Sequence, residues 1–187
     1  MPDADRRLWL DNYDPSRYLP GVYEPILFVN GTNDFAYPLN SYQRSYQLAK
    51  GPRTLCVTVR MPHDHPQGWA PKEIGLFVDS VINKGKPLAQ FGPVTTDGTW
   101  GKKVTASVRS VVPVKAAALH YTTDLGTWNA REWKTVLATL DAKGAIAAEL
   151  PAGDGITWFL TVTDERGATV SSEHQVRAQR TDAARRG

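Results

Sequence analysis

Residues 26–37 read Ile-Leu-Phe-Val-Asn-Gly-Thr-Asn-Asp-Phe-Ala-Tyr, and the expected fold is built around them. The first four of these residues form a short apolar run that ends just before Gly31, which predicts a buried strand of a parallel sheet at 26–30. The polar turn after this strand contains Asp34. Open α/β sheets place their ligands at the carboxyl ends of the strands, so Asp34 is a candidate functional residue.

The sequence around this stretch predicts alternating helices and strands. Residues 1–24 indicate a short helix or turn, because Pro and Gly interrupt any longer element. A helix at 41–49, a strand at 54–60 and a helix at 72–83 follow, with short connections. This order is typical of a parallel sheet. Two strands cannot form such a sheet alone, so we expect further strands from outside this chain or from before its start.

The pattern changes after Pro87 to short strand-like runs separated by turns, which predicts an antiparallel immunoglobulin-like sandwich without its disulfide. The predicted fold class is therefore α/β, a partial α/β sheet with flanking helices in residues 1–87, followed by an all-β sandwich in 88–178. A disordered basic tail is predicted at 179–187. The predicted sandwich strands are 103–109, 116–122, 133–139, 144–149, 156–163 and 168–176.

Composition excludes several functional classes. The chain is 41% hydrophobic and 22% charged, as is usual for a globular protein. Its net charge of +3 lies in the segment from Arg177 onward, so the body carries no basic face and no nucleic-acid partner is expected. No run of 18 apolar residues predicts a membrane span. The charged N-terminus lacks a secretion signal, and the compartment stays unknown.

The remaining chemistry-bearing side chains of the chain suit structural roles. The single cysteine, Cys56, lies in an apolar run and is interpreted as a small buried hydrophobe. His120 and His174 fall in the predicted sandwich and are expected to be structural. The tryptophans of that region are interpreted as sandwich core rather than as a platform for sugar stacking; they are Trp128, Trp133 and Trp158.

A histidine follows the strand 54–60, about thirty residues after Asp34. Both residues would lie at the carboxyl ends of neighbouring parallel strands. A carboxylate in that position can hold an imidazole in the tautomer that a general base needs. Two histidines qualify, His63 and His65. Two histidines without a third nearby ligand fall short of a zinc site, so no metal is predicted.

Residues 25–38 resemble the acid-strand motif of α/β-hydrolases, and residues 51–71 resemble the strand and loop that carry the histidine of that family. The similarity is to the acetyl xylan esterases and the prolyl-oligopeptidase-type serine hydrolases. Residues 118–124, Trp128 and 131–133 resemble the β-domain that follows the catalytic domain in some members.

The resemblance implies that Asp34 is the triad acid and His63 the triad base. The family often has glycine after this histidine, whereas this chain has Asp64, so His65 stays the alternative base. No Gly-x-Ser-x-Gly motif occurs in the chain. The expectation is therefore the C-terminal portion of a serine hydrolase that lacks its nucleophile and is inactive alone.

The resemblance also implies a reaction: hydrolysis of a carboxylic ester of the acetyl-ester type. The alternatives are a serine peptidase of the prolyl-oligopeptidase type and a non-catalytic β-module that binds carbohydrate or protein. Tyr37 and Trp69 are candidate pocket residues, and no cofactor is implied. The expected partners are a small ester or acylated saccharide as substrate, and a separate N-terminal hydrolase segment or a second copy joined through open sheet edges.

Overall fold

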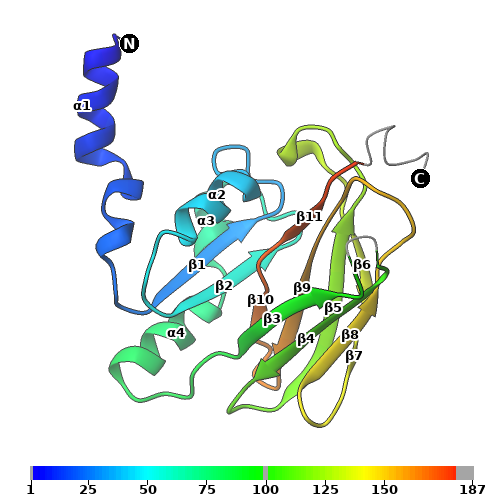
Figure 1. Ribbon diagram of the computed structural model, residues 1–187. Coiled ribbons are helices and arrows are strands. Elements are labelled where there is room, and N and C mark those ends of the chain that lie inside the picture. The colour runs from blue at the N-terminus through cyan, green and yellow to red at the C-terminus, as the bar shows by residue number, and fades with distance from the viewer. Residues whose placement is uncertain (1, 99–100, 180–187) are drawn as a thin grey trace.

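The computed structural model describes residues 2–98 and 101–179 (Figure 1). The helices are α1 (Asp3–Tyr13), α2 (Leu39–Tyr46), α3 (His65–Trp69) and α4 (Glu73–Ile82), with 3-10 turns at Pro15–Arg17, Leu19–Gly21 and Trp128–Ala130. The strands are β1 (Ile26–Gly31), β2 (Arg53–Thr58), β3 (Gln90–Thr96), β4 (Lys103–Arg109), β5 (Val114–Thr122), β6 (Lys134–Leu137), β7 (Thr139–Leu140), β8 (Ala145–Glu149), β9 (Ile156–Asp164), β10 (Thr169–Ser171) and β11 (Gln175–Arg177).

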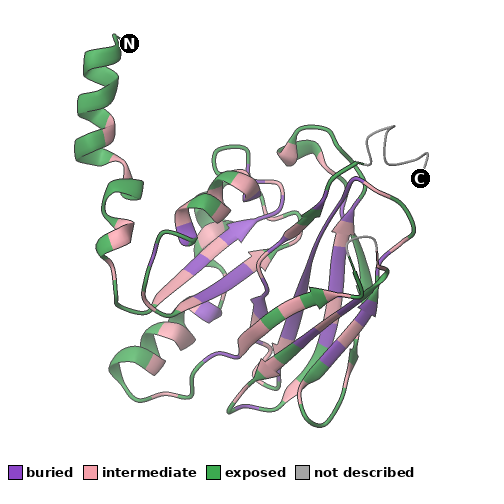
Figure 2. Cartoon of the chain, viewed as in Figure 1, coloured by how far each residue is buried: buried purple, intermediate pink, exposed green. Residues whose placement is uncertain are grey.

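The strands form two sheets. Sheet A has the order β1-β2-β10-β9-β5-β6, with β11 also paired to β9, and sheet B has the order β3-β4-β8-β7. Fully buried side chains fill the space between the sheets, among them Leu119 and Leu160 from sheet A and Val104 and Ile146 from sheet B. Figure 2 shows this core as buried segments on the facing strands. The sandwich therefore holds the principal core of the described chain.

The predicted fold class is wrong. The regular secondary structure of the described chain is mostly β-strand, arranged in two sheets, and it does not show the sheet of an α/β-hydrolase. β1 and β2 do pair in parallel, in register from Ile26↔Arg53 to Gly31↔Thr58. The other edge of β2 pairs with the antiparallel strand β10, at Ser171↔Leu55. The parallel pair is thus an extension of the sandwich sheet, while the proposed boundary near Pro87 stays a prediction.

Most individual elements agree with the sequence patterns. β1, β2, α4 and the strands from β4 onward lie within about two residues of the expected ranges, except that 133–139 and 168–176 each divide into two strands, and α2 begins two residues and ends three residues earlier than expected. β3 was missed because Gly92 and Pro93 interrupt it. The structure accommodates them at a register shift between Phe91 and Val94, on an edge strand where a missing N–H costs little. The tail predicted from residue 179 lies, beyond its first residue, outside the described residues.

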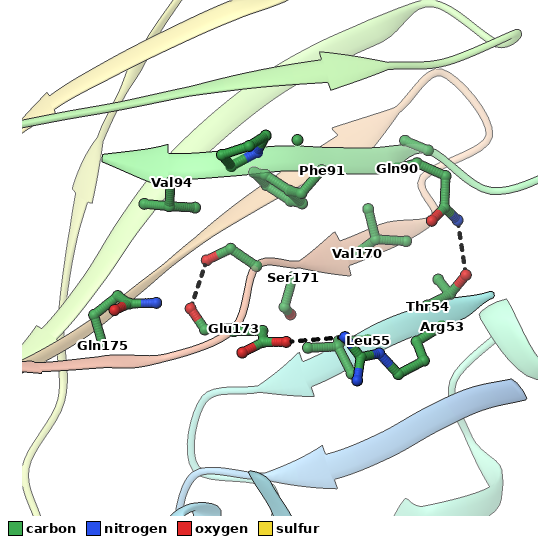
Figure 3. A pocket seen from close by; sticks show the side chains of 14 residues that line it. Arg53, Thr54, Leu55, Gln90, Phe91, Val94, Val170, Ser171, Glu173 and Gln175 are labelled. Atoms are coloured by element: carbon green, nitrogen blue, oxygen red, sulfur yellow. Dashed lines mark hydrogen bonds and ion pairs between the residues drawn. The ribbon is translucent and has the colours of Figure 1, made fainter. Parts of the chain in front are cut away.

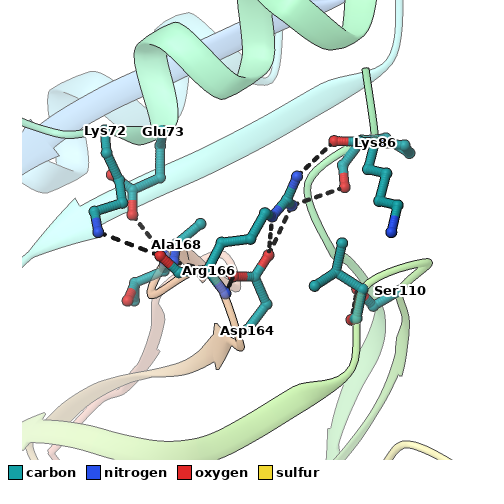
Figure 4. A network of polar contacts seen from close by, with 10 residues as sticks. Lys72, Glu73, Lys86, Ser110, Asp164, Arg166 and Ala168 are labelled. Carbon is teal, nitrogen blue, oxygen red and sulfur yellow. Dashed lines mark hydrogen bonds and ion pairs between the residues drawn. The ribbon is translucent and has the colours of Figure 1, made fainter. Parts of the chain in front are cut away.

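Arg166 connects the sandwich to the segment before β3 (Figure 4). Its Nε and Nη2 bond Oδ2 of the buried Asp164 at 2.9 and 2.7 Å. The same guanidinium donates to the carbonyl oxygens of Lys86 and Pro87 at 2.7 and 3.1 Å. Nearby, Glu73 at the start of α4 accepts the Thr169 N–H. These contacts hold α4 and the predicted boundary against the β9–β10 hairpin.

We expect Arg166→Ala to lower the free energy of unfolding by about 3 kcal/mol, because it leaves the Asp164 carboxylate buried and without its cation. Urea denaturation measures this difference. Arg17→Ala is the matched control, since Arg17 pairs with Asp11 on the surface, where both side chains are about half exposed, and should cost at most about 1 kcal/mol. Equal effects of the two variants would contradict the assigned role of Arg166.

The two sandwich histidines are buried. His120 lies between the hydroxyls of Thr135 and Thr161, at 2.8 and 2.9 Å, and stacks on Phe159. Burial lowers the pKa of His120 to about 4. His174 lies between β10 and β11, where burial, with a smaller contribution from Arg131, lowers its pKa to about 4. Both are structural, neutral imidazoles at neutral pH.

These lowered pKa values predict acid lability. The unfolded chain binds protons at these histidines below about pH 6.5 and the folded chain only near pH 4. The contribution of the neutral histidines to the free energy of unfolding is therefore complete above pH 6.5. It falls as the pH drops toward 4, by up to about 3 kcal/mol per histidine. Urea midpoints at pH 7 and pH 4.5 measure the loss. His120→Gln should reduce this loss, and an unchanged loss would contradict the role of His120.

Candidate functional site

The loops after β1 and β2 bring Asp34 and His63 together. Oδ2 of Asp34 lies 2.9 Å from Nδ1 of His63. The other carboxylate oxygen, Oδ1, accepts the backbone N–H groups of Ala36 and Tyr37, both at 2.8 Å. Asp34 is only 6% exposed. Because three hydrogen bonds fix the carboxylate, it presents one oxygen to the imidazole in a defined direction.

This contact determines which nitrogen of His63 can act as a base. An ionised carboxylate only accepts hydrogen bonds, so the Nδ1 of His63 carries the proton. The lone pair of the neutral ring is then on Nε2, for which the described residues contain no hydrogen-bond donor. The His63 side chain is 42% exposed. The arrangement suits a general base with an accessible Nε2.

The alternative base, His65, takes a different role. It begins α3, and its backbone N–H donates to Oδ1 of Asp64 at 2.7 Å. Its side chain forms no hydrogen bond to Asp34. Asp64 stands where the resembled family often has glycine, and its backbone is extended, with φ −155°. No glycine is needed there, and Asp64 instead caps α3.

Glycine is required on the other side of the site. A Cβ at Gly31 would collide with the carbonyl oxygen of Met61, so this position lets the histidine loop cross the end of β1. Thr32 completes the junction: its hydroxyl accepts the N–H of Arg60 at 2.8 Å and donates to Oδ1 of Asn33 at 2.7 Å. The acid loop and the histidine loop are therefore joined directly.

The sandwich is attached to the same loop. Nδ2 of Asn33 donates to the carbonyl oxygens of Asn129 and Arg131, at 2.8 and 3.1 Å. The Arg131 guanidinium stacks 3.8 Å from the Trp128 ring, and Trp128 contacts the buried His174 edge to face. The residue next to Asp34 thus holds a sandwich loop almost one hundred positions away.

Aromatic rings flank the imidazole. The rings of Phe35 and Tyr37 lie 5.3 and 5.5 Å from that of His63, centroid to centroid, and both are more than half exposed. Tyr37 and Trp69, the candidate pocket residues, both line a cavity of about 790 Å³ that reaches Asp34 and His63. Its other walls include Leu27 and Val29 of β1, His65 at the start of α3, and the apolar face of α4, which contributes Ile74, Phe77 and Val78.

Several residues of the site carry no recognisable signal in the sequence. Phe35 is adjacent to Asp34 in the motif that marked the site, yet nothing in its spacing indicates that its ring turns toward His63. Thr32 and Asn33 look like ordinary turn residues. The signal for their roles is tertiary, because their partners lie on other loops.

No serine of the described residues lies next to this pair. No serine lines the cavity, and none bonds His63. The eight serines lie in the 3-10 turn after α1, on α2 and α4, and in the sandwich. No group of three or more His, Cys, Asp or Glu within residues 2–98 and 101–179 could hold a metal ion. No helix in those ranges is both long and apolar enough to cross a membrane.

Comparisons with known proteins do not identify a family for this chain. No family model matches the chain, and no curated protein does. A carbohydrate-binding module of family 56, a β-1,3-glucan binding domain, is 15% identical with a TM-score of 0.30, over 46% of this chain and 95% of that one. A polysaccharide deacetylase from Bacillus cereus is 10% identical with a TM-score of 0.25, over 46% of this chain and 28% of that one. Similarity at this level carries no inference about function.

Asp34→Asn should reverse the tautomer of His63 without loss of the fold. The amide oxygen can still accept the N–H groups of Ala36 and Tyr37, while its NH₂ donates to Nδ1 and moves the ring proton to Nε2. Long-range ¹H–¹⁵N NMR of the imidazoles distinguishes the two tautomers. Asp64→Asn is the matched control, because Asp64 does not bond the ring, and should leave His63 unchanged. The same tautomer in wild type and Asp34→Asn would contradict the assignment.

Proposed function

We propose that Asp34 and His63 are the acid and base of a hydrolytic site that cleaves carboxylic esters through a serine nucleophile. The observation that carries the proposal is the 2.9 Å contact between Asp34 Oδ2 and His63 Nδ1, with Nε2 free beside a large cavity. The resemblance of residues 25–38 and 51–71 to serine hydrolases supports it. The substrate class is a small ester or an acylated saccharide.

In this mechanism His63 acts twice. Nε2 first accepts the proton of the attacking serine hydroxyl, and Asp34 stabilises the resulting imidazolium without itself becoming protonated. The imidazolium then gives this proton to the leaving alcohol, and an acyl-enzyme forms. Water, deprotonated by the same Nε2, then attacks the acyl carbon, and the imidazolium returns this proton to the serine oxygen as the bond between serine and acyl group breaks and the acid leaves. Asp34 and the two flanking rings hold the imidazole in place through each transfer.

The serine is proposed to come from a polypeptide that pairs with the free edge of β1. Alternate residues of a strand direct their backbone groups to the same side. The N–H of Ile26 and that of Thr32 point to the β2 side, so Leu27, Val29 and Gly31 face away. Within residues 2–98 and 101–179, the backbone groups of Leu27 and the N–H of Val29 form no hydrogen bond. Leu27 and Val29 of this edge both line the cavity next to Asp34 and His63.

Exposed apolar surface next to this edge supports the same placement. Val78, Val81 and Ile82 of α4 are 46–68% exposed. α1 contributes no buried residue and projects from the body in Figure 1, with Trp9 and Tyr13 exposed. An apolar surface next to an unpaired strand is typical of an interaction site. The partner is thus a chain segment that supplies both a strand and the serine.

The reactivity of His63 can be measured in the isolated chain, without the serine-bearing partner. Reaction with p-nitrophenyl acetate should acylate His63 of the isolated chain, detected by intact mass and by release of p-nitrophenol. His63→Gln should lose this reaction, and Asp34→Asn should slow it at least about tenfold, because the ring proton then blocks Nε2. His65→Gln is the matched control and should react like the wild type.

Two results would contradict the proposal. Equal rates for wild type and His63→Gln would remove the acid–base role of the pair. Stoichiometric labelling of the isolated chain by a fluorophosphonate probe, lost in Asp34→Asn, would place the serine within this chain and overturn the separate nucleophile. A p-nitroanilide substrate, tested once the serine-bearing partner is added, separates the esterase from the peptidase alternative.

A further inference from the structure

A second cavity lies on the other side of β2 from the β1 edge. Its volume is about 360 Å³, and its walls come from the start of β2, from β3, and from β10 and the segment after it. Figure 3 shows the side chains that line it. β2 contains six residues and spans about 20 Å. The cavity adjoins the beginning of this strand, whereas His63 follows its end, so the two sites are distinct.

Backbone pairing explains why the cavity exists. β10 pairs with β2 only at Ser171↔Leu55. The next residue, Ser172, is held by Leu160 of β9 instead: its N–H donates to the Leu160 carbonyl at 2.8 Å, and its hydroxyl accepts the Leu160 N–H at 2.9 Å. The chain therefore leaves β2 while β3 continues in the other sheet. The cavity is preformed by this divergence.

One wall of the cavity is apolar. Phe91 and Val94 extend from β3 into the gap, and Val170 and Leu55 lie opposite them (Figure 3). Leu55 and Val170 are buried, whereas Phe91 and Val94 are half-buried. An aromatic ring at the side of a polar cavity offers a flat surface to the C–H face of a bound ring.

The cavity contains one positive and one negative side chain, and these two form an ion pair with each other. Arg53 and Glu173 form an ion pair at 3.5 Å, with both side chains about one third exposed. Each also has a second partner: Arg53 donates to the Tyr46 carbonyl at 3.0 Å, and Glu173 accepts from Nε2 of Gln47 at 2.9 Å. The pair is held in place before any ligand arrives. A site with one cation and one anion already paired favours an uncharged ligand.

Two amides supply further hydrogen-bonding capacity. Nε2 of Gln90 donates to the Thr54 hydroxyl at 2.7 Å, which fixes this amide and leaves its oxygen as an acceptor. The Gln175 side chain has no hydrogen bond among the described residues, so both its donor and its acceptor are available. A ligand hydroxyl both donates and accepts, and it matches this mixture better than a group that only accepts.

We propose that this cavity binds a neutral saccharide unit, with Phe91 against the ring and Gln90, Gln175 and Glu173 on its hydroxyls. Its volume lies at the small end of ligand sites, which suits one or two sugar rings. The binding site needs neither a nucleophile nor the Asp34–His63 pair. It therefore goes beyond the proposed hydrolytic function and does not depend on it.

The test is a ¹H–¹⁵N NMR titration of the full chain with xylobiose and, separately, cellobiose. We expect saturable shifts confined to residues 53–55, 90–94 and 170–175 for at least one of the two. Gln175→Ala should weaken binding about fivefold, the effect of one hydrogen bond. Phe91→Leu should weaken it further while it preserves the apolar volume. Gln67→Ala, an exposed glutamine on α3 outside the cavity, is the matched control.

Three results would overturn the proposal. The first is the absence of saturable shifts at these residues with both disaccharides. The second is wild-type affinity in both Gln175→Ala and Phe91→Leu. The third is tighter binding of acetate or glycine than of either sugar, which would show that the Arg53–Glu173 pair recognises charge.

Discussion

The hydroxyl of Ser171 forms two hydrogen bonds to Val57, accepting from its N–H at 2.8 Å and donating to its carbonyl oxygen at 3.3 Å. β2 and β10 share only one backbone register pair, so this side chain continues the pairing where the backbone stops. The parallel pair has a small core of its own, Phe28, Tyr46, Ala49 and Leu55. Within the sheet, this connection and the single register pair attach it to the strands of the large sandwich, while Asn33 and Glu73 connect its loops and α4 to the sandwich.

The sequence patterns predicted the elements well and their assembly poorly, for one physical reason. Apolar periodicity and turn residues are local, and they indicated β1, β2 and α4 within about two residues. The neighbour of a sheet edge is not local: β10 follows β2 by more than one hundred positions. A parallel β-α-β order suggested more parallel strands, whereas the sandwich supplied an antiparallel one. The sequence did not predict β3, because Gly92 and Pro93 are unfavourable in central strands; both are tolerated at an edge.

The candidate site likewise has features that local sequence predicts and features that depend on tertiary contacts. Asp34 and a histidine near 63–65 could be predicted because parallel strands bring their carboxyl ends together. The choice between His63 and His65 depended on a resemblance, and the structure brings only His63 to Asp34. The sequence did not predict the roles of Asn33, Phe35 and Gly31. Each of them contacts a segment whose position in space cannot be predicted from local sequence patterns. Local chemistry identified the pair, and tertiary contacts determine its surroundings.

The free edge of β1 is already partly satisfied by this chain. The Tyr42 hydroxyl donates to the Val29 carbonyl at 2.9 Å, and Oδ1 of Asn30 accepts the Gly31 N–H at 2.8 Å. Both bonds lie toward the carboxyl end of the strand, next to the acid loop. The unpaired groups of this edge are thus the backbone groups of Leu27 and the N–H of Val29. A strand that pairs there would leave the Asp34 turn undisturbed, because that turn is held by its own hydrogen bonds and, through Asn33, by the sandwich. The hydrogen bonds that position Asp34 beside His63 therefore do not depend on a strand at this edge.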